Sequence, residues 1–411
     1  MKILAIDTSC DDTSIAIVEK KNNQIKVISS VVSSQIQIHA PYGGVYPMLA
    51  KRAHQKNLVP VLTKALKKAK LLNPLPKKSD AIRSDRSILH QAEIHKILEK
   101  DEVLRTLTIN FLNTYQNPNQ KNTLTKKIKV DAIAITNTPG LEPCLWQGIN
   151  FAKALSLYWN VPLIPVNHIK AHLAANFLQK ISCNFQFPIS NFQNLYPAIG
   201  LVASGGHTEL IYMPKQGTYK IIGSTRDDAA GECFDKTARI LGLPYPGGPS
   251  LASQAKLKMK NEKLKIELPR PMINSKDFDF SFSGLKTAVL YNFQSQKKSA
   301  QKSKDYKIAM AKEIQQAIID VLISKTLKAS EQFKVKSIVT GGGVMANKEL
   351  RKQFKFKIKN LKLKIPFFVP KKSLCIDNAV MVGVKALFSN QKVSHSSKAW
   401  QNIQASGNLD I

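Results

Sequence analysis

The sequence predicts an α/β protein with a duplicated, actin-like or sugar-kinase-like two-lobed fold and one inserted, partly helical element. Two observations lead to this prediction. The apolar runs 3–7 and 14–18 are joined by the polar turn TSCDDT, and the segment 197–213 repeats this pattern of strand, turn and strand in the middle of the chain. Each half then continues with units of strand, loop and helix, of which 336–354 is the last. Repeated units of this kind favour two packed lobes.

Length and composition agree with a globular enzyme. A chain of 411 residues is too long for one small core and suits two lobes. The hydrophobic fraction of 43% is ordinary for a soluble protein, and no apolar run approaches the roughly 18–20 residues that span a bilayer. The N-terminal MKILAIDTSC is too short an apolar stretch for a signal peptide. We therefore expect a cytoplasmic protein that does not contact a membrane.

Charge and cysteine content limit which partners and which redox chemistry the protein can have. The net charge is +33, from 61 Lys plus Arg against 28 Asp plus Glu, which would attract a polyanion such as a nucleic acid. Lysine used as the default surface residue would explain the same charge. Cys10, Cys144, Cys183, Cys233 and Cys375 lie far apart and form no Cys-x-x-Cys pair. Neither a disulfide framework nor a cysteine zinc site is predicted.

The remaining elements of the first half follow from hydrophobic periodicity. In chain order they are strands at 27–32, 130–136 and 161–166 and helices at 47–70, about 147–158 and 168–179. The predicted N-terminal lobe comprises 1–71 and 130–195, with 376–395 packing back on it, and the C-terminal lobe comprises 196–375. The tail 396–411 is expected to be loosely held, because the chain after about residue 391 is rich in Ser, Asn and Gln.

Residues 72–129 interrupt this pattern. They contain NPLPKKSD, a mixed-charge helical stretch and NPNQKNTLTKK, which indicate an inserted surface element outside the catalytic core. The lysine-containing flanks 77–86 and 121–129 would suit phosphate contacts to a nucleic acid or contacts to a partner protein. A solvated decoration without a role is the alternative.

A histidine pair is the first candidate functional motif. His168 and His172 are four residues apart in a predicted helix, which places both imidazoles on one face. This arrangement suits two ligands of one metal ion, although a pair of ordinary histidines has the same spacing. A metalloprotease of the zincin type needs a Glu directly after the first histidine, and Ile169 stands there. The metalloprotease interpretation is therefore disfavoured.

Glycine-rich turns are the second kind of candidate. SGGHT at 204–208 joins two strands, and GGG at 341–343, followed by Asn347, lies between a strand and a helix. Backbone N–H groups in such turns can approach a phosphate closely. The second turn is neither a P-loop nor a dinucleotide fingerprint, so an actin-like nucleotide site fits better. A tight hairpin turn would explain the first segment equally well.

Two acidic segments complete the set of candidates. DDAAGECFDK at 227–236, followed by Gly247 and Gly248, offers a helical carboxylate that can bind ribose hydroxyls, with a capped amphipathic helix as the alternative. Asp377 precedes the apolar stretch VMVGVKALF. It is interpreted either as the cap of a helix there or as a hard-oxygen metal ligand.

These motifs together resemble the tRNA N6-adenosine threonylcarbamoyltransferases, a family called TsaD in bacteria and formerly labelled O-sialoglycoprotein endopeptidase. The resemblance covers most of the chain outside 72–129 and the tail. It runs through DTSCDDTSIAIV, PYGGVYPMLAKRAH, TPGLEPCL, NHIKAHLAANF, LVASGGHTEL, DDAAGECFDKTARILGLPYPGGPSLA, FSFSGLKTAV, VTGGGVMANKELR and CIDNAVMVG.

The resemblance implies an enzyme that transfers the threonylcarbamoyl group from threonylcarbamoyl-adenylate to the N6 amine of adenosine 37 in tRNAs reading codons that begin with A, with release of AMP. It implies one divalent metal per subunit, iron or alternatively zinc, through which His168, His172 and Asp377 act in catalysis. The implied partners are tRNA, the paralogous protein TsaB and the ATPase TsaE. The implied substrate contacts are Val202, Ala203, Ser204, Gly205, Gly206, Asp235, Gly248 and Asn347.

The chain departs from the family pattern at three places. Asp7 and Asp12 stand where the family often has Glu, Lys170 and Ala171 stand where it usually has Glu and Gly, and 136–138 lacks its usual Arg. The metal ligands remain, so the activity is still expected. An actin-like ATPase or sugar kinase is one rival interpretation, but such an enzyme needs no histidine pair. A non-catalytic paralogue is another, but it would be expected to lose a metal ligand.

Overall fold

The computed structural model describes the chain as two compact units. The first unit comprises Met1–Gln35, Val45–Leu178 and Asp377–Asp410, and the second comprises Ile36–Gly44 and Gln179–Ile376. The segment 36–44 thus belongs to the second unit, although the residues on either side of it belong to the first. The structure describes residues 1–22, 24–72, 85–115, 128–178, 194–261, 263–361, 365–389 and 399–408.

The first unit is built on a five-stranded sheet with the order β3-β2-β1-β4-β5. Its strands are β1 (Lys2–Asp7), β2 (Asp12–Lys21), β3 (Gln24–Ser34), β4 (Ala132–Thr138) and β5 (Leu163–Asn167). The first three strands pair antiparallel, with Asp7 opposite Ser14 at the turn, whereas β4 and β5 run parallel to β1. The hairpin and the three further strands predicted from the sequence are confirmed.

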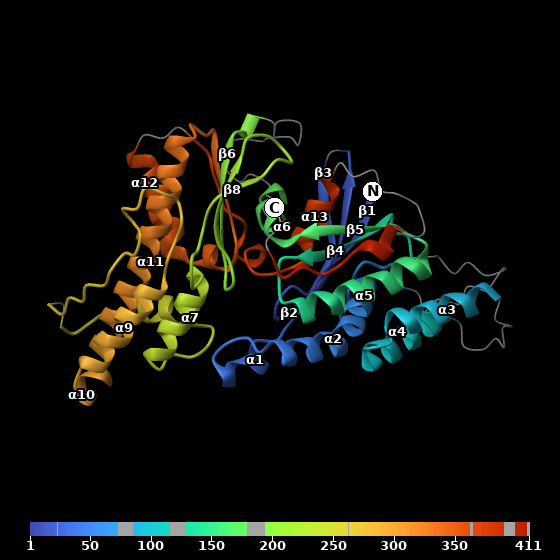
Figure 1. Ribbon diagram of the computed structural model, residues 1–411, viewed down its shortest axis with the longest axis horizontal. Helices are drawn as coiled ribbons and strands as arrows, with labels where there is room; N and C mark the ends of the chain where they lie inside the picture. Colours follow the sequence, from blue (N-terminus) through green and yellow to red (C-terminus); the bar gives the residue numbers. More distant parts are fainter. Residues whose placement is uncertain are drawn as a thin grey trace. The chain divides into compact units, whose positions relative to one another are not determined.

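Helices cover both faces of this sheet (Figure 1). Leu4 and Ile6 share a buried cluster with residues of α2 (Pro47–Lys68) and α5 (Glu142–Trp159). Side chains alternate along a strand, so Ala5 points to the opposite face. There α13 (Ala379–Leu387) approaches so closely that a Cβ at Gly383 would lie 3.1 Å from the Cβ of Ala5. The short α6 (His168–Ala174), continued by η2 (Ala175–Leu178), packs against α13.

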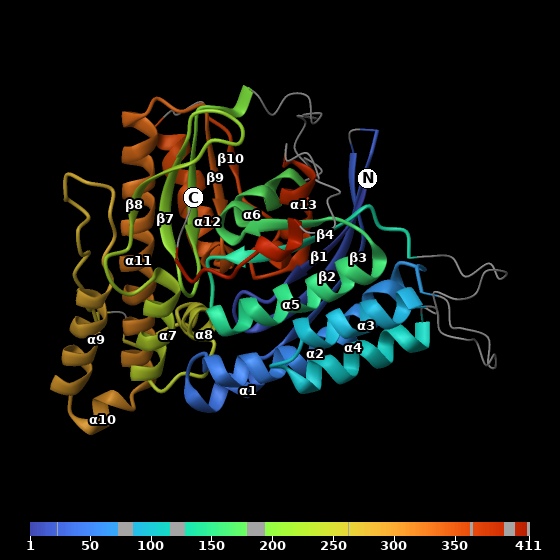
Figure 2. The same ribbon diagram turned by 45° about the vertical axis from the view of Figure 1, so that its right-hand side comes forward.

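The inserted element forms two helices, α3 (Asp85–Ile97) and α4 (Glu102–Tyr115), seen beside α2 in Figure 2. Leu104 and Phe111 are buried in the same cluster as the sheet and α5. Between the two helices, the buried Asp101 accepts hydrogen bonds from Gln55 at 2.7 Å and from Gln147 at 3.2 Å. These helices therefore bury one face in the core of the first unit and expose the other. The segments 73–84 and 116–127, which include most of the lysine-containing flanks, lie outside the described residues.

The described part of the tail is held more firmly than its composition predicts. It contains η6 (Ala399–Asn402), and Ile403 is buried in the core of the first unit. Backbone groups of Asn137 and Ser406 bond at 3.0 Å, and the Thr138 hydroxyl donates to the carbonyl of Asn408 at 2.7 Å. These bonds fix residues 403–408 along the end of β4. Residues 396–398 and 409–411 lie outside the described residues.

The second unit repeats the strand order of the first. Its strands are β6 (Ala198–Ala203), β7 (Thr208–Met213), β8 (Lys220–Ser224), β9 (Ser337–Gly341) and β10 (Phe367–Phe368). They are ordered β10-β9-β6-β7-β8, with an antiparallel β6-β7-β8 meander and parallel β9 and β10. Both sheets thus place a three-stranded meander beside two parallel strands. The predicted duplicated α/β fold is confirmed.

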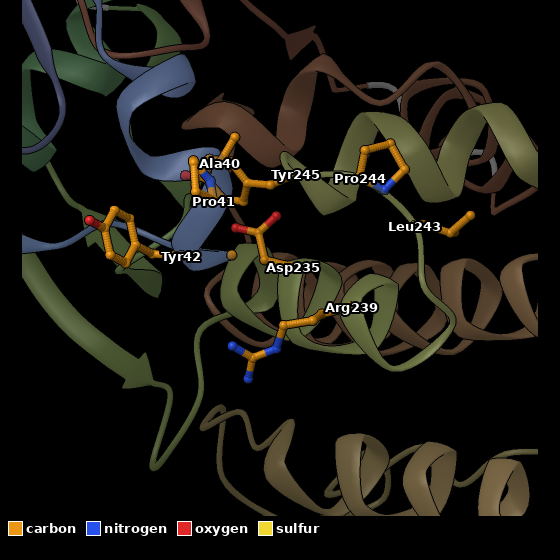
Figure 3. Close-up of a pocket in the computed structure, with 9 residues that line it drawn as sticks. Ala40, Pro41, Tyr42, Asp235, Arg239, Leu243, Pro244 and Tyr245 are labelled. Carbon is orange, nitrogen blue, oxygen red and sulfur yellow. The ribbon is translucent and has the colours of Figure 1, made fainter.

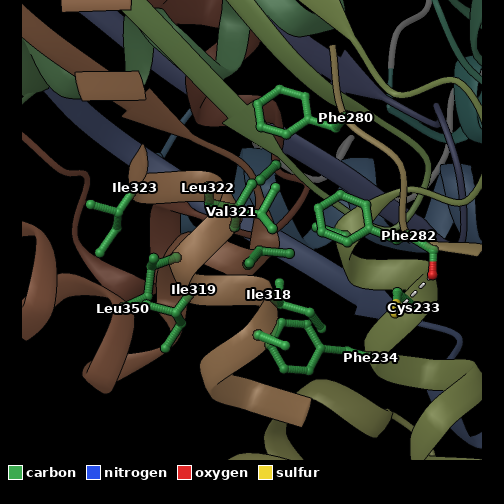
Figure 4. Close-up of a cluster of buried hydrophobic side chains, with 14 of the residues drawn as sticks. Cys233, Phe234, Phe280, Phe282, Ile318, Ile319, Val321, Leu322, Ile323 and Leu350 are labelled. Carbon is green, nitrogen blue, oxygen red and sulfur yellow. Dashed lines mark hydrogen bonds between the residues drawn. The ribbon is translucent and has the colours of Figure 1, made fainter. Parts of the chain in front are cut away.

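The second unit has a large apolar core, in which α11 packs on the sheet and further helices pack on α11 (Figure 4). Its helices are α7 (Ala230–Ile240), α8 (Gly247–Gln254), α9 (Ser283–Ser295), α10 (Lys298–Gln301), α11 (Lys304–Gln332) and α12 (Lys348–Asn360). Phe234, Phe280 and Phe282 meet Ile318 and Leu322 of α11 in this core. The rings of Phe280 and Phe282 stack with centroids 6.3 Å apart. Burial of these side chains is the main source of the unit's stability.

Cys10, Cys144, Cys233 and Cys375 are free thiols, and Cys183 lies outside the described residues. Within the ranges that the structure describes, no helix combines the length and the apolar character needed to cross a membrane.

Candidate metal centre and glycine-loop site

The two predicted histidine ligands lie on one face of α6. Strand β5 ends at Asn167, whose side chain caps the helix by accepting a hydrogen bond from the Lys170 backbone at 2.9 Å. This cap fixes the start of the helix at His168 and sets His172 one turn later. The two imidazoles stand edge to face with centroids 4.6 Å apart, and both are buried.

Asp377 completes a three-residue cluster with these histidines. Its Oδ1 lies 3.4 Å from Nε2 of His168 and 3.2 Å from Nε2 of His172. The sequence left open whether Asp377 caps α13, and the structure assigns the cap to Asn378, which accepts from the Met381 backbone at 3.1 Å. The carboxylate of Asp377 therefore points to the histidines.

The donor set and its spacing fit a divalent metal ion. One ligand atom from each of the three residues lies within 4.8 Å of the other two. Donors that share one ion at about 2.0–2.2 Å lie about 3.0–3.5 Å from one another, close to the two histidine–carboxylate distances. Two imidazoles and one carboxylate suit iron or zinc and leave positions open for a substrate.

The pKa shifts of His172 and Asp377 favour the neutral imidazole and the ionised carboxylate. Burial, followed by the neighbouring His168, lowers the pKa of His172, which favours the neutral imidazole. Burial opposes ionisation of Asp377, but the charge of His168 and hydrogen bonds from both histidines hold its pKa well below the usual range. A metal ligand must be a neutral imidazole or an ionised carboxylate, so both directions suit the site.

A second carboxylate, which the sequence analysis noted only as a departure from the family, lies behind His168. Asp7 ends β1, and its Oδ2 is 3.9 Å from Nδ1 of His168. The side chain is fully buried, and burial raises its pKa. Carboxylates in this place commonly orient a metal-bound histidine through its other nitrogen. The sequence signal was an acidic residue at the end of a wholly apolar strand.

In the second unit, the predicted glycine turns converge beside β6. Val202 and Ala203 end this strand with buried side chains, so they can offer a ligand only their backbone. Ser204, Gly205 and Gly206 form the turn to β7, in which the Ser204 backbone donates to the His207 carbonyl at 2.8 Å. A Cβ at Gly205 or Gly206 would have no atom within 4 Å.

The turn at 341–343 packs against the end of the same strand. Gly342 has a φ of 90°, in the region that favours glycine. A Cβ there would overlap the carbonyl of Ala203, so glycine allows the two turns to touch. Gly343, which opens η4 (Gly343–Ala346), has open space around it. The two turns therefore touch, with Gly205 and Gly206 exposed and Gly341 and Gly342 buried.

Asp235, Gly248 and Asn347 each have a structural role as well. Asp235 on α7 accepts a hydrogen bond from the Gly247 backbone at 2.7 Å, which joins α7 to the start of α8. Gly248 follows, with no contact closer than 3.9 Å to an added Cβ. Asn347 caps α12 by accepting from Glu349 at 2.9 Å and donates to Gln315 at 2.9 Å.

A cavity of about 260 Å³ adjoins Asp235 within the second unit. Its walls are residues 40–43, Asp235 and Arg239 of α7, and residues 243–245. Residues 40–43 belong to η1 (Ala40–Tyr42), which follows the single turn α1 (Ile36–His39), and the capping Gly43. Figure 3 shows Asp235 directed from α7 toward Ala40 and Pro41.

Comparisons with known proteins give a family match, named relatives and a remote structural neighbour. Residues 26–80 and 110–384 match the family model described as tRNA N6-adenosine threonylcarbamoyltransferase. The protein of that name from Syntrophomonas wolfei is 37% identical over 384 residues, covering 93% of this chain and 91% of the relative. That from Persephonella marina is 39% identical, covering 93% and 88%. A ROK hexokinase structure from Thermus thermophilus aligns with a TM-score of 0.41 and 10% identity over 94% of this chain and 97% of the hexokinase.

Proposed function

This chain belongs to the tRNA N6-adenosine threonylcarbamoyltransferase family and is a transferase, and on that premise we propose its reaction in detail. It transfers the threonylcarbamoyl group of threonylcarbamoyl-adenylate to the N6 amine of adenosine 37 in tRNAs that read codons beginning with A. The amine nitrogen forms a bond to the carbamoyl carbon while the bond from that carbon to the adenylate oxygen breaks. AMP leaves with the electron pair, and the amine proton passes to water or to a phosphate oxygen.

The cluster of His168, His172 and Asp377 is the observation that supports this proposal most strongly. A kinase or ATPase of the same fold has no need for two buried imidazoles that converge on a carboxylate. The 3.2 Å and 3.4 Å separations of these donors suit one divalent ion, for which we propose iron, with zinc as the alternative. A bound ion of this kind supplies Lewis acidity to phosphate and carbamoyl oxygens.

The residues of the chain supply binding and orientation. The turns at 204–206 and 341–343 present backbone N–H groups to the adenylate, which holds the mixed anhydride in one pose. Asp235 is proposed to accept from the ribose hydroxyls, with Gly248 allowing the nucleoside to lie close to the backbone. Asn347, which caps α12 through its oxygen, offers its amide group at the edge of the same site. Asp7 orients His168.

Partners and location are also proposed. The acceptor is tRNA, and the family resemblance supports TsaB and TsaE as protein partners of a cytoplasmic assembly. A net charge of +33 supports a polyanionic partner.

Mass spectrometry of nucleosides tests the proposal. Unmodified tRNA is incubated with the metal-loaded chain, TsaB, TsaE and threonylcarbamoyl-adenylate, then digested to nucleosides. We expect N6-threonylcarbamoyladenosine to appear at position 37, and Asp377→Ala to abolish it. Absence of the modified nucleoside with the wild-type chain would refute the proposed reaction, and full activity of Asp377→Ala would refute the metal centre.

A further inference from the structure

The outer face of α12 carries four lysines in a single row. Lys348, Lys352, Lys355 and Lys359 are all exposed and follow one another at intervals of four, three and four residues. At 3.6 residues per turn these positions fall within roughly 60° of the helix circumference, and the row is roughly 16 Å long. We call these four residues the α12 lysine face.

The opposite face of α12 anchors the helix. Leu350, Phe354 and Ile358 are buried, and the Phe354 ring stacks on Phe367 with centroids 4.9 Å apart. Arg351 donates to the carbonyl of Pro370 at 2.8 Å. The helix is therefore fixed along α11, which it contacts (Figure 1). Its lysine face is exposed.

None of the four lysines of the α12 lysine face forms an ion pair with a residue that the structure describes. The ion pairs described in the second unit involve Arg226, Lys236, Arg270, Lys286 and Lys325, all on other elements. Glu349 is the only acidic residue of α12, and its carboxylate accepts a hydrogen bond from Gln353 at 3.0 Å. Lysines three and four residues apart on a helix repel one another. An anionic ligand would relieve this repulsion along the whole row.

Neighbouring cations and an aromatic side chain extend the surface. Lys372, in η5 (Lys372–Leu374), interacts with Lys348, Arg351 and Lys256, and desolvation followed by these like charges lowers its pKa. Phe356 is 60% exposed at the border of the lysine face. A row of cations beside an exposed aromatic ring is typical of surfaces that bind RNA, where the backbone meets lysines and a base stacks on the ring.

We propose that the α12 lysine face binds the phosphate backbone of RNA, with Phe356 stacking on an unpaired base. The proposal rests on the proposed function for the identity of that RNA, which is the tRNA acceptor. A membrane surface fits less well, because Leu350, Phe354 and Ile358 are buried, and the exposed Phe356 and Leu361 do not make the continuous apolar face that enters a bilayer.

Salt-dependent binding of tRNA tests this surface. The full-length chain is titrated against a fluorescent, unmodified tRNA transcript at several KCl concentrations, without adenylate. One variant replaces the four lysines of the α12 lysine face by Gln. A matched control replaces Lys297, Lys298, Lys302 and Lys304, four exposed lysines in and around α10, by Gln. Both variants lose the same charge and keep good helix formers at the substituted helical positions.

The two variants should differ in the slope of log K against log salt. Each lost phosphate contact reduces the magnitude of the slope by about 0.7–0.9. The slope of the α12 variant should therefore fall in magnitude by about three, and that of the control by less than one. Phe356→Ala should weaken binding about fivefold or more with little change in slope. Equal losses in the two lysine variants, or no binding of wild-type protein at low salt, would overturn the proposal. So would binding to phosphatidylglycerol vesicles that depends on the α12 lysine face while binding to tRNA does not.

Failure of this surface can be distinguished from failure of the proposed function. Binding is measured without transfer, whereas the modified nucleoside is measured directly. If the wild-type chain makes no modified nucleoside but the α12 variant loses slope, the reaction is refuted and the surface stands. If transfer occurs and the two lysine variants bind alike, the surface is refuted and the reaction stands.

Discussion

Alanine at Gly206 and alanine at Gly342 are expected to act in opposite ways, although both positions lie in touching turns of the second unit. A Cβ at Gly206 would have no atom within 4 Å, and the backbone there is not left-handed. Gly206→Ala should therefore change the free energy of unfolding by less than about 1 kcal/mol, in the stabilising direction, because alanine restricts the unfolded chain. If the turn binds the adenylate, the new methyl group holds the ligand away from the backbone.

Gly342→Ala should instead destabilise the unit. The φ of 90° and ψ of 158° are nearly exclusive to glycine, and such strain costs about 1–3 kcal/mol. The added Cβ would also lie 3.0 Å from the backbone nitrogen of Ala203 and nearer still to its carbonyl group, in a central strand that cannot move aside. We expect a loss of about 2 kcal/mol or more, which lowers Tm by about 4–8 °C for a unit of this size.

Calorimetry separates the two effects. Scanning calorimetry gives Tm, and titration calorimetry with AMP gives the affinity. Loss of one hydrogen bond to a charged phosphate corresponds to about 1.5–3 kcal/mol, so Gly206→Ala should raise the Kd for AMP about tenfold or more at unchanged Tm. If Gly206→Ala binds AMP with wild-type affinity, the turn is a hairpin that does not contact the adenylate. A wild-type Tm in Gly342→Ala would refute the close approach of the two turns.

Three further predictions concern the metal centre, Asp12 and helix α4. Asp377→Ala should remove the bound metal, as measured by elemental analysis. Asp235→Ala should keep the metal and weaken AMP binding. Equal metal content in the two variants would refute Asp377 as a metal ligand. In metal-free protein, burial and then Asp11 raise the pKa of Asp12 to about 7, so ionisation of Asp12 destabilises the fold as pH rises from about 4 to above 7. Asp12→Asn should therefore gain up to about 4 kcal/mol over the wild type across that interval, and a pH-independent difference in urea unfolding would contradict this. Phe111→Ala should lower the free energy of unfolding by about 3–5 kcal/mol. Val103→Ala, at an exposed position of the same helix, should lower it by less than about 0.5 kcal/mol. Similarly small losses in both variants would show that α4 does not contribute to the core.

The sequence predicted the strands well because local patterns determine them. Apolar runs such as 3–7 and 130–136 are bounded by polar turns, so their position in a sheet follows from burial alone. The histidine pair was predicted for the same reason, since its spacing is a property of one helix. The role of Asp377 could not be predicted, because an Asp at this position can either cap the helix or bind a metal. The start of α13 decides the question, since Asn378 is the residue that caps it.

The packing of the insertion could not be predicted. Helix α4 is bounded by polar segments, and its apolar residues could face solvent, a partner or the core with the same local pattern. Phe111 is buried because α4 packs against α2, from which it is distant in sequence, and joins the buried cluster of the first unit. Likewise, the hydrogen bonds of the tail to Asn137 and Thr138 depend on tertiary structure and override a composition that is typical of loose termini.

The repeated strand order places different groups at corresponding positions of the two units. Asp7 ends β1 beside the histidine cluster, whereas Ala203, at the corresponding end of β6, leads into the glycine turn. Each unit also has its own hydrophobic core. A substitution in the histidine cluster should therefore leave the core beneath the glycine turns intact, so the two candidate sites can be varied separately.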